Sequence, residues 1–200
     1  METRPCHSPQ GALASLVETL VERRRFLKVG LAGFLAASVP LLSARDVQAA
    51  ANYGQWKISM HHARTGESFS GVYRVGDQYL PEAFERMNYL LRDFRSDEAF
   101  PMDPHVIDIL SVVQARTRTG RPMEVLSGYR CPKTNAMLRH ETRGVAKKSL
   151  HMFGQAIDFR MPGFNTGRLR NLAQNLKAGG VGYYPRSNFV HVDTGALRHW

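Results

Sequence analysis

After residue 52, apolar residues recur at steps of three and four in three stretches, which is the spacing of one helix face. The first stretch follows Pro81 and runs to about residue 94. The second has Asp103 as its predicted N-cap, Pro104 at the first helical position and Gly120 at its end. The third ends at Gly179. The three stripes are Phe84, Met87, Leu91 and Phe94; Val106, Ile109, Leu110 and Val113; and Leu169, Leu172, Ala173 and Leu176.

Short apolar runs around these helices predict strands. In one of them, Gly76 and Asp77 mark the turn of a hairpin. A further short helix is expected in PKTNAMLRH. The predicted strand segments are WKISM, ESFSGVYRVGDQYL, MEVLSGYR, GQAIDFR, GGVGYYP and NFVHVDTG. This order of elements predicts one α+β domain over residues 52–200, with a small, mostly antiparallel sheet and helices on one face.

Alternation along the last predicted strand divides its residues between two faces. Phe189, His191 and Asp193 point to one face, and Val190 and Val192 to the other. We therefore expect the two valines in the core, and His191 together with Asp193 on the opposite face.

Residues 1–51 have the pattern of an export signal. Arg23–Arg25 with Lys28 form a basic segment, Val29–Leu42 an apolar segment, and Val47–Ala49 a small-residue cleavage site. The run RRRFLK resembles the twin-arginine (Tat) consensus, with Glu22 where Ser or Thr is usual. A membrane anchor is the alternative, but the apolar segment has about 14 residues, whereas a spanning helix needs about 20. We expect export by the Tat machinery to the periplasm.

The charge of the chain indicates what kind of partner it binds, and its cysteine content bears on disulfides. The composition, 43% hydrophobic and 22% charged, is that of a soluble globular domain. Residues 1–51 hold six of the 27 basic and four of the 17 acidic residues, so the predicted domain keeps a net charge of about +8. A basic exported domain favours an anionic envelope partner such as peptidoglycan, and the export signal argues against nucleic acid. Cys131, expected in a loop, is the only cysteine after residue 51, which excludes an internal disulfide there.

Two histidines and an aspartate suggest a metal site. Catalytic zinc takes three protein ligands, among them imidazole nitrogen and carboxylate oxygen, and keeps a fourth position open. His151 precedes Asp158 by seven residues, with Gly154 allowing a turn and Ala156 leaving room beside the acid. His191 on a neighbouring strand can supply a third ligand. Such spacings also arise by chance, so spacing alone leaves open that His151 and Asp158 are merely near each other in sequence.

Three ordered segments, SGYRCPKTN, SLHMFGQAIDF and GGVGYYPRSNFVHVDTGALRHW, resemble the zinc peptidases of the D-Ala-D-Ala carboxypeptidase and VanX dipeptidase group, whose fold is shared with hedgehog signalling domains. They resemble in particular the Tat-exported, YcbK-like branch of murein endopeptidases. The resemblance covers most of residues 52–200. It implies a hedgehog/DD-peptidase-like fold, Zn²⁺ as cofactor, and His151, Asp158 and His191 as its ligands. It also implies that Arg130 binds a substrate carbonyl or carboxylate, where a guanidinium can stabilise an oxyanion.

The general base is not assigned by this resemblance. Relatives carry a Glu or a His at the positions held here by Asn188 and Phe189, and neither of these residues can accept a proton. Asp193 is the candidate, because it shares the face of His191. Its alternative role is to orient His191. Three further residues stay open as bases: His140, Glu141 and His199.

We therefore expect a periplasmic zinc metallopeptidase that hydrolyses peptide bonds in peptidoglycan stem peptides or cross-links, as a murein endopeptidase in cell-wall remodelling. The alternatives are a carboxypeptidase that trims stem peptides, a noncatalytic peptidoglycan-binding module, and an iron oxygenase that uses His191 and Asp193. No stable membrane insertion is expected if the signal is cleaved. The remaining candidates receive structural interpretations: His61 and His62 as a surface pair, and Tyr183, Tyr184 and Trp200 as core or cleft wall.

Overall fold

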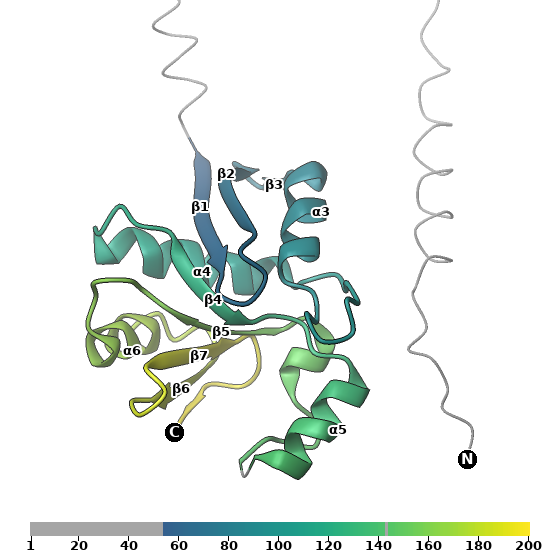
Figure 1. Cartoon of the computed structure of the whole chain (residues 1–200). Helices are drawn as coiled ribbons and strands as arrows, with labels where there is room; N and C mark the ends of the chain where they lie inside the picture. The colour runs from purple at the N-terminus through teal and green to yellow at the C-terminus, as the bar shows by residue number, and fades with distance from the viewer. Residues whose placement is uncertain (1–53, 143) are drawn as a thin grey trace, which may run out of the picture. The chain divides into compact units, whose positions relative to one another are not determined.

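The computed structural model describes residues 54–142 and 144–200 (Figure 1). The predicted signal peptide, residues 1–51, lies outside the described residues. Within the described residues, no helix has the length and apolar character needed to cross a membrane.

A single mixed sheet forms the centre of the described chain. Its strand order is β3-β2-β1-β4-β5-β7-β6-β8. The strands are β1 (Gln55–His62), β2 (Ser68–Val75), β3 (Gln78–Tyr79), β4 (Met123–Ser127), β5 (Ala156–Arg160), β6 (Gly180–Tyr184), β7 (Phe189–Asp193) and β8 (Arg198–His199). Only the β1–β4 and β6–β8 pairs are parallel, and the others are antiparallel. The mostly antiparallel sheet predicted from the sequence is confirmed.

Helices cover one face of this sheet. The helices are α3 (Pro81–Leu90), α4 (Pro104–Thr117), α5 (Pro132–Glu141), α6 (Thr166–Gln174) and the 3-10 helix η2 (Leu150–Phe153). Helices α4 and α6 contact each other and the sheet; in Figure 1, α4 passes behind β1, α6 lies at the left, and α5 lies at the lower right. Tyr73 of β2 links α3 to the same layer, because its ring packs against Phe84 and its hydroxyl donates to Asp108 of α4. The predicted α+β class with helices on one face is confirmed.

The core lies between the helices and the sheet, as strand alternation predicts. Val190 and Val192 of β7 are fully buried there, beside Ile157 and Phe159 of β5. The residues between them on each strand therefore point to the opposite face.

Two helices are shorter than their apolar patterns suggest. Helix α3 ends at Leu90 instead of residue 94, because the carbonyl oxygen of Leu91 accepts the Tyr129 N–H at 2.7 Å. Helix α6 ends at Gln174, well before Gly179. Helix α4 ends at Thr117, where Arg118 takes a left-handed conformation two residues before Gly120. The sequence pattern also did not predict β8 or η2.

Candidate metal centre

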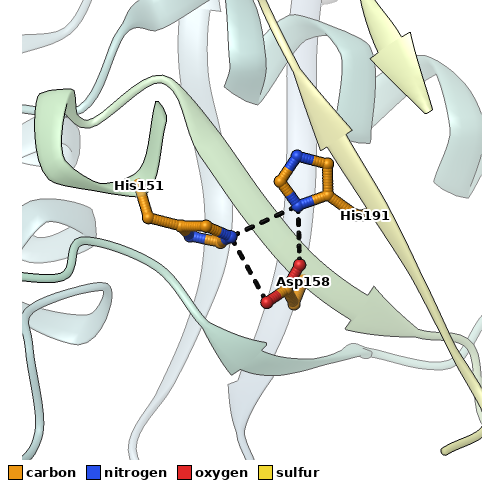
Figure 2. A group of neighbouring side chains, drawn as sticks. All are labelled: His151, Asp158 and His191. Carbon is orange, nitrogen blue, oxygen red and sulfur yellow. Dashed lines mark hydrogen bonds and ion pairs between the residues drawn. The ribbon is translucent and has the colours of Figure 1, made fainter. Parts of the chain in front are cut away.

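One row of residues crosses the sheet on the face opposite the core. Cross-strand pairing places Ser127 of β4 beside Asp158 of β5, Asp158 beside His191 of β7, and His191 beside Gly182 of β6. Paired residues on neighbouring strands project to the same face. Asp158 and His191 are thus neighbours, and His151 reaches them from η2 (Figure 2).

Three potential ligand atoms converge at this point (Figure 2). His191 Nδ1 lies 2.8 Å from Asp158 Oδ1, His151 Nε2 lies 3.3 Å from Asp158 Oδ2, and the two nitrogens lie 3.2 Å apart. His151 is 2% exposed and His191 9% exposed. Across residues 54–142 and 144–200, this is the one group of at least three His, Cys, Asp or Glu side chains whose ligand atoms converge in this way.

His151 is held by a tight turn and a backbone acceptor. Gly154, with φ +67°, ends η2, and a Cβ at this position would lie 2.3 Å from the carbonyl oxygen of Pro101. The turn brings His151 Nδ1 to 2.7 Å from the carbonyl oxygen of Gly128. A carbonyl only accepts hydrogen bonds, so Nδ1 carries the proton and Nε2 presents its lone pair to the centre.

Asp193 orients the His191 ring from the side away from the ligand atoms. Its Nε2 lies 3.0 Å from Asp193 Oδ2, which leaves Nδ1 to face Asp158 and His151. The Asp193 carboxylate is fully buried and also accepts hydrogen bonds from the Gly180 and Gly195 backbone N–H groups and from Arg198. Asp193 therefore lies across the imidazole from the ligand atoms. This geometry favours an orienting role over that of a general base.

Arg130 lies at the edge of the cluster. Its Nη2 is 3.5 Å from Asp158 Oδ2 and 3.2 Å from Ser127 Oγ. Its Nε is buried and has no hydrogen-bond partner within the described chain. The guanidinium thus keeps donor capacity for a further acceptor.

The segment from Gly128 to Cys131 joins Arg130 to His151. The Arg130 N–H donates to the carbonyl oxygen of His151 at 3.1 Å, and the His151 ring contacts the Gly128 carbonyl oxygen. Cys131 lies in the loop before α5, as expected; it is buried there, caps α5 through Sγ, and its N–H donates to Asp93 at 2.9 Å. The same short segment therefore positions the arginine and one histidine.

The electrostatics of the cluster favour an ionised carboxylate. Burial alone would raise the pKa of Asp158, but His151 and His191 outweigh this effect and the pKa falls below its usual range. Burial lowers the pKa of His151, which favours its neutral form. Burial would also lower the pKa of His191, but the hydrogen bonds to Asp158 and Asp193 raise it to about 9.

These donors fit zinc. Two imidazole nitrogens, each with its other nitrogen hydrogen-bonded, and one carboxylate form the ligand set of many catalytic zinc sites. Three protein ligands leave the fourth position of a tetrahedral zinc ion for water or substrate, as in catalytic sites.

Other candidates from the sequence lie elsewhere. His140 and Glu141 are exposed on the last turn of α5, and His199 is exposed on β8. His62 is not the exposed member of a surface pair, because it is fully buried and its Nδ1 accepts hydrogen bonds from the Arg64 and Thr65 N–H groups.

The sequence pattern predicted Tyr184 and Trp200 as core or cleft wall, and the structure places the Trp200 ring next to His191. The Trp200 ring lies 5.4 Å from the His191 ring, and its Nε1 donates to the Tyr184 hydroxyl at 2.9 Å. Alternation along β6 puts Tyr184 on the same face as Gly182, the partner of His191. This pattern could have placed Tyr184 on the metal-site face from the sequence. The place of Trp200 depends on β8, which the sequence pattern did not predict.

Comparison with known proteins gives one consistent family. The family described as peptidoglycan L,D-endopeptidase MepK matches residues 49–200. The chain is 43% identical over 143 residues to the peptidoglycan L,D-endopeptidase MepK of Escherichia coli (strain K12), a match that covers 72% of this chain and 79% of that protein. It is 40% identical over 144 residues to the probable peptidoglycan L,D-endopeptidase MepK of Haemophilus influenzae, covering 72% of this chain and 77% of that protein.

Proposed function

The chain belongs to the family of the peptidoglycan L,D-endopeptidase MepK, and from this premise we propose that it is an exported zinc peptidase that cleaves peptide bonds in peptidoglycan cross-links. The observation that carries the proposal is the buried convergence of His151, Asp158 and His191. A cluster of this composition without a metal would leave a carboxylate and two imidazoles buried together at a cost in desolvation. A bound cation removes that cost.

In this proposal His151 Nε2, one Asp158 oxygen and His191 Nδ1 hold the zinc ion. Zinc bound there would supply Lewis-acid activation of the scissile carbonyl and of water. Gly128 and Asp193 act through the histidines, since each fixes the nitrogen that does not face the ion.

Arg130 is proposed to bind the substrate oxygen on the β4 side of the cluster. Its guanidinium is held near Asp158 by contacts with the Ser127 and Asp158 side chains, on a segment whose backbone donates to His151. A positive charge fixed in a buried position stabilises negative charge that develops during hydrolysis more strongly than a solvated one does. Arg130 therefore supplies charge without having to move.

Asp193 is proposed as a positioning residue, because it contacts the His191 nitrogen that does not face the ion.

Asn188 and Phe189 hold the two positions that carry a possible general base in relatives. The Asn188 side chain accepts a hydrogen bond from Thr166, and the Phe189 ring stacks on Tyr184 at 4.4 Å. The two positions where relatives carry a Glu or a His are therefore occupied by groups engaged in structural contacts.

The proposed location is the periplasm after export by the Tat machinery, from the RRRFLK run and the apolar segment that follows it. The net positive charge of the domain suits a polymer whose stem peptides carry carboxylates. Peptidoglycan peptides are the proposed partner.

The test uses the full chain loaded with zinc and incubated with cross-linked muropeptides. We expect mass spectrometry to show cleavage of the cross-link, and no cleavage by His151→Ala. Binding without any product would favour the noncatalytic module. Release of a single terminal residue would favour the carboxypeptidase.

A further inference from the structure

The row of residues that carries the metal ligands ends at a glycine. Gly182 pairs with His191 and lies on the same face of the sheet. A Cβ at Gly182 would lie 2.8 Å from the Trp200 ring and 2.9 Å from the Tyr184 ring, closer than side chains approach each other. The missing side chain thus makes space for these two aromatic rings directly beside His191.

The two rings hold each other in a defined arrangement. Trp200 Nε1 donates a hydrogen bond to the Tyr184 hydroxyl at 2.9 Å. Indole N–H is only a donor, so the Tyr184 oxygen is the acceptor and its own proton is left for another partner. In the described part of the chain, no residue accepts that proton through a hydrogen bond. Stacking on Phe189, with ring centroids 4.4 Å apart, fixes the plane of the Tyr184 ring.

Arg130 and Tyr184 approach the cluster from opposite sides. Arg130 contacts Ser127 of β4 and Asp158 of β5, whereas Tyr184 belongs to β6, on the far side of His191. Burial lowers the pKa of Arg130, and Asp158 and Tyr184 are among the neighbouring groups that oppose this effect. The site therefore has a cationic donor on one flank and a neutral hydroxyl donor on the other.

We propose that Tyr184 is a catalytic residue whose hydroxyl donates a hydrogen bond to the oxygen of the scissile carbonyl, opposite Arg130, while Trp200 positions that hydroxyl. This inference rests on the proposed peptidase function. No bond of Tyr184 forms or breaks, because its proton is shared with the substrate oxygen and returns when the product leaves. A hydrogen bond to an oxygen that gains negative charge is stronger in the transition state than in the bound substrate, so the contact raises kcat more than it lowers KM.

The test compares Tyr184→Phe with Tyr183→Phe in the zinc-loaded full chain. Tyr183 neighbours Tyr184 in β6 but points to the opposite face, where its ring packs beneath Arg170. We expect Tyr184→Phe to lower kcat by about 100-fold with little change in KM, as for removal of one oxyanion donor. Tyr183→Phe should keep the wild-type kcat. Zinc content should be unchanged in both variants.

A second measurement does not depend on turnover. A phosphinate analogue of the cross-link peptide has a tetrahedral anionic centre where the scissile carbonyl would be, and we expect Tyr184→Phe to weaken its binding by about 10- to 100-fold. Trp200→Phe keeps an aromatic ring but removes the N–H that holds the hydroxyl, so it should give a smaller loss of kcat and of analogue binding. It also tests the inference if Tyr184→Phe folds poorly.

The outcomes separate the two proposals. If wild type cleaves muropeptides and Tyr184→Phe matches its kcat and its affinity for the analogue, the role of Tyr184 is wrong and the peptidase function stands. If the zinc-loaded wild type cleaves nothing, the peptidase function is wrong. In that case analogue binding still tests the hydrogen bond of the Tyr184 hydroxyl. Equal affinity of wild type and Tyr184→Phe for the analogue rejects this hydrogen bond, and weaker binding by Tyr184→Phe supports it.

Discussion

His191 lies between two carboxylates, with Nδ1 2.8 Å from Asp158 and Nε2 3.0 Å from the buried Asp193. Only the Nδ1 contact with Asp158 lies on the side of the ring that faces His151. The Nε2 contact with Asp193 fixes the plane of the ring and increases the electron density on Nδ1, which faces the proposed ion. The two aspartates therefore have different roles although both touch the same histidine.

Substitution of Asp193 by Asn tests this division of roles. We expect zinc affinity to fall by about 10- to 100-fold, because the amide is a weaker acceptor for the His191 N–H. Asp77→Asn is the control, since this side chain is 98% exposed and, among residues 54–142 and 144–200, pairs only with Arg74. Titration against a chromophoric chelator gives the affinities. Unchanged zinc affinity together with lost hydrolysis would instead assign Asp193 to proton transfer.

Removal of a proposed ligand is expected to abolish stoichiometric zinc binding. His151→Ala and Asp158→Ala each leave two of three donors, which do not suffice for a stable zinc site. His105→Ala removes an exposed imidazole that lies 3.0 Å from Asp103 and far from the proposed ligand set in sequence, and should bind zinc as wild type does. Metal analysis after dialysis measures the difference. Wild-type zinc content in both ligand variants would refute the site.

Gly154 is expected to be far less tolerant of substitution than Gly66. Both have positive φ, +67° and +76°, so alanine costs about 1–3 kcal/mol at either position. At Gly66 nothing lies within 4 Å of the added carbon, whereas at Gly154 it would meet the Pro101 carbonyl oxygen. Urea unfolding should show the larger loss for Gly154→Ala, and zinc affinity should fall with it because η2 carries His151. Equal stability of the two variants would contradict this account.

The ion pair between Glu124 and Arg160 gives a prediction about pH. Arg160 donates to both Glu124 oxygens at 2.8 and 2.7 Å and thereby joins β4 to β5. These hydrogen bonds hold the pKa of Glu124 below its usual value, although burial opposes them. A carboxyl with a lowered folded-state pKa stabilises the fold above its unfolded pKa, and this contribution is lost as pH falls through the folded pKa.

Glu124→Gln should therefore be less stable than wild type at pH 7, by up to about 1 kcal/mol. The difference should disappear at pH values well below about 4. Urea unfolding of both proteins at pH 7 and pH 3 measures it. A difference of the same size at both pH values would show that packing, and not charge, is the cause.

Strand periodicity was enough to predict most of the sheet. It also predicted that His191 and Asp193 lie on the same face of their strand. Alternation along FVHVD was enough to separate Val190 and Val192 from His191 and Asp193, because each strand residue can point to only two faces. The arrangement of His151 beside them needed the turn at Gly154, whose φ the residue type suggested.

Features that depend on distant contacts were not predictable in this way. Helix α3 stops early because Tyr129 takes the Leu91 carbonyl oxygen, and no pattern near Leu91 indicates that partner. His62 looked like half of an exposed pair, yet it is buried beside Phe94. Trp200 reaches His191 only through the pairing of β8 with β6, which involves two residues of β8.

The backbone hydrogen bond from Arg130 to His151 has a consequence for how such a site can diversify. Main-chain hydrogen bonding fixes the segment that carries Arg130 against His151, and Ser127 and Asp158 then hold the guanidinium. The aromatic flank of the site comes from separate elements, since Tyr184 belongs to β6 and Trp200 follows β8. A shift of that flank would therefore leave the spacing between Arg130 and His151 unchanged.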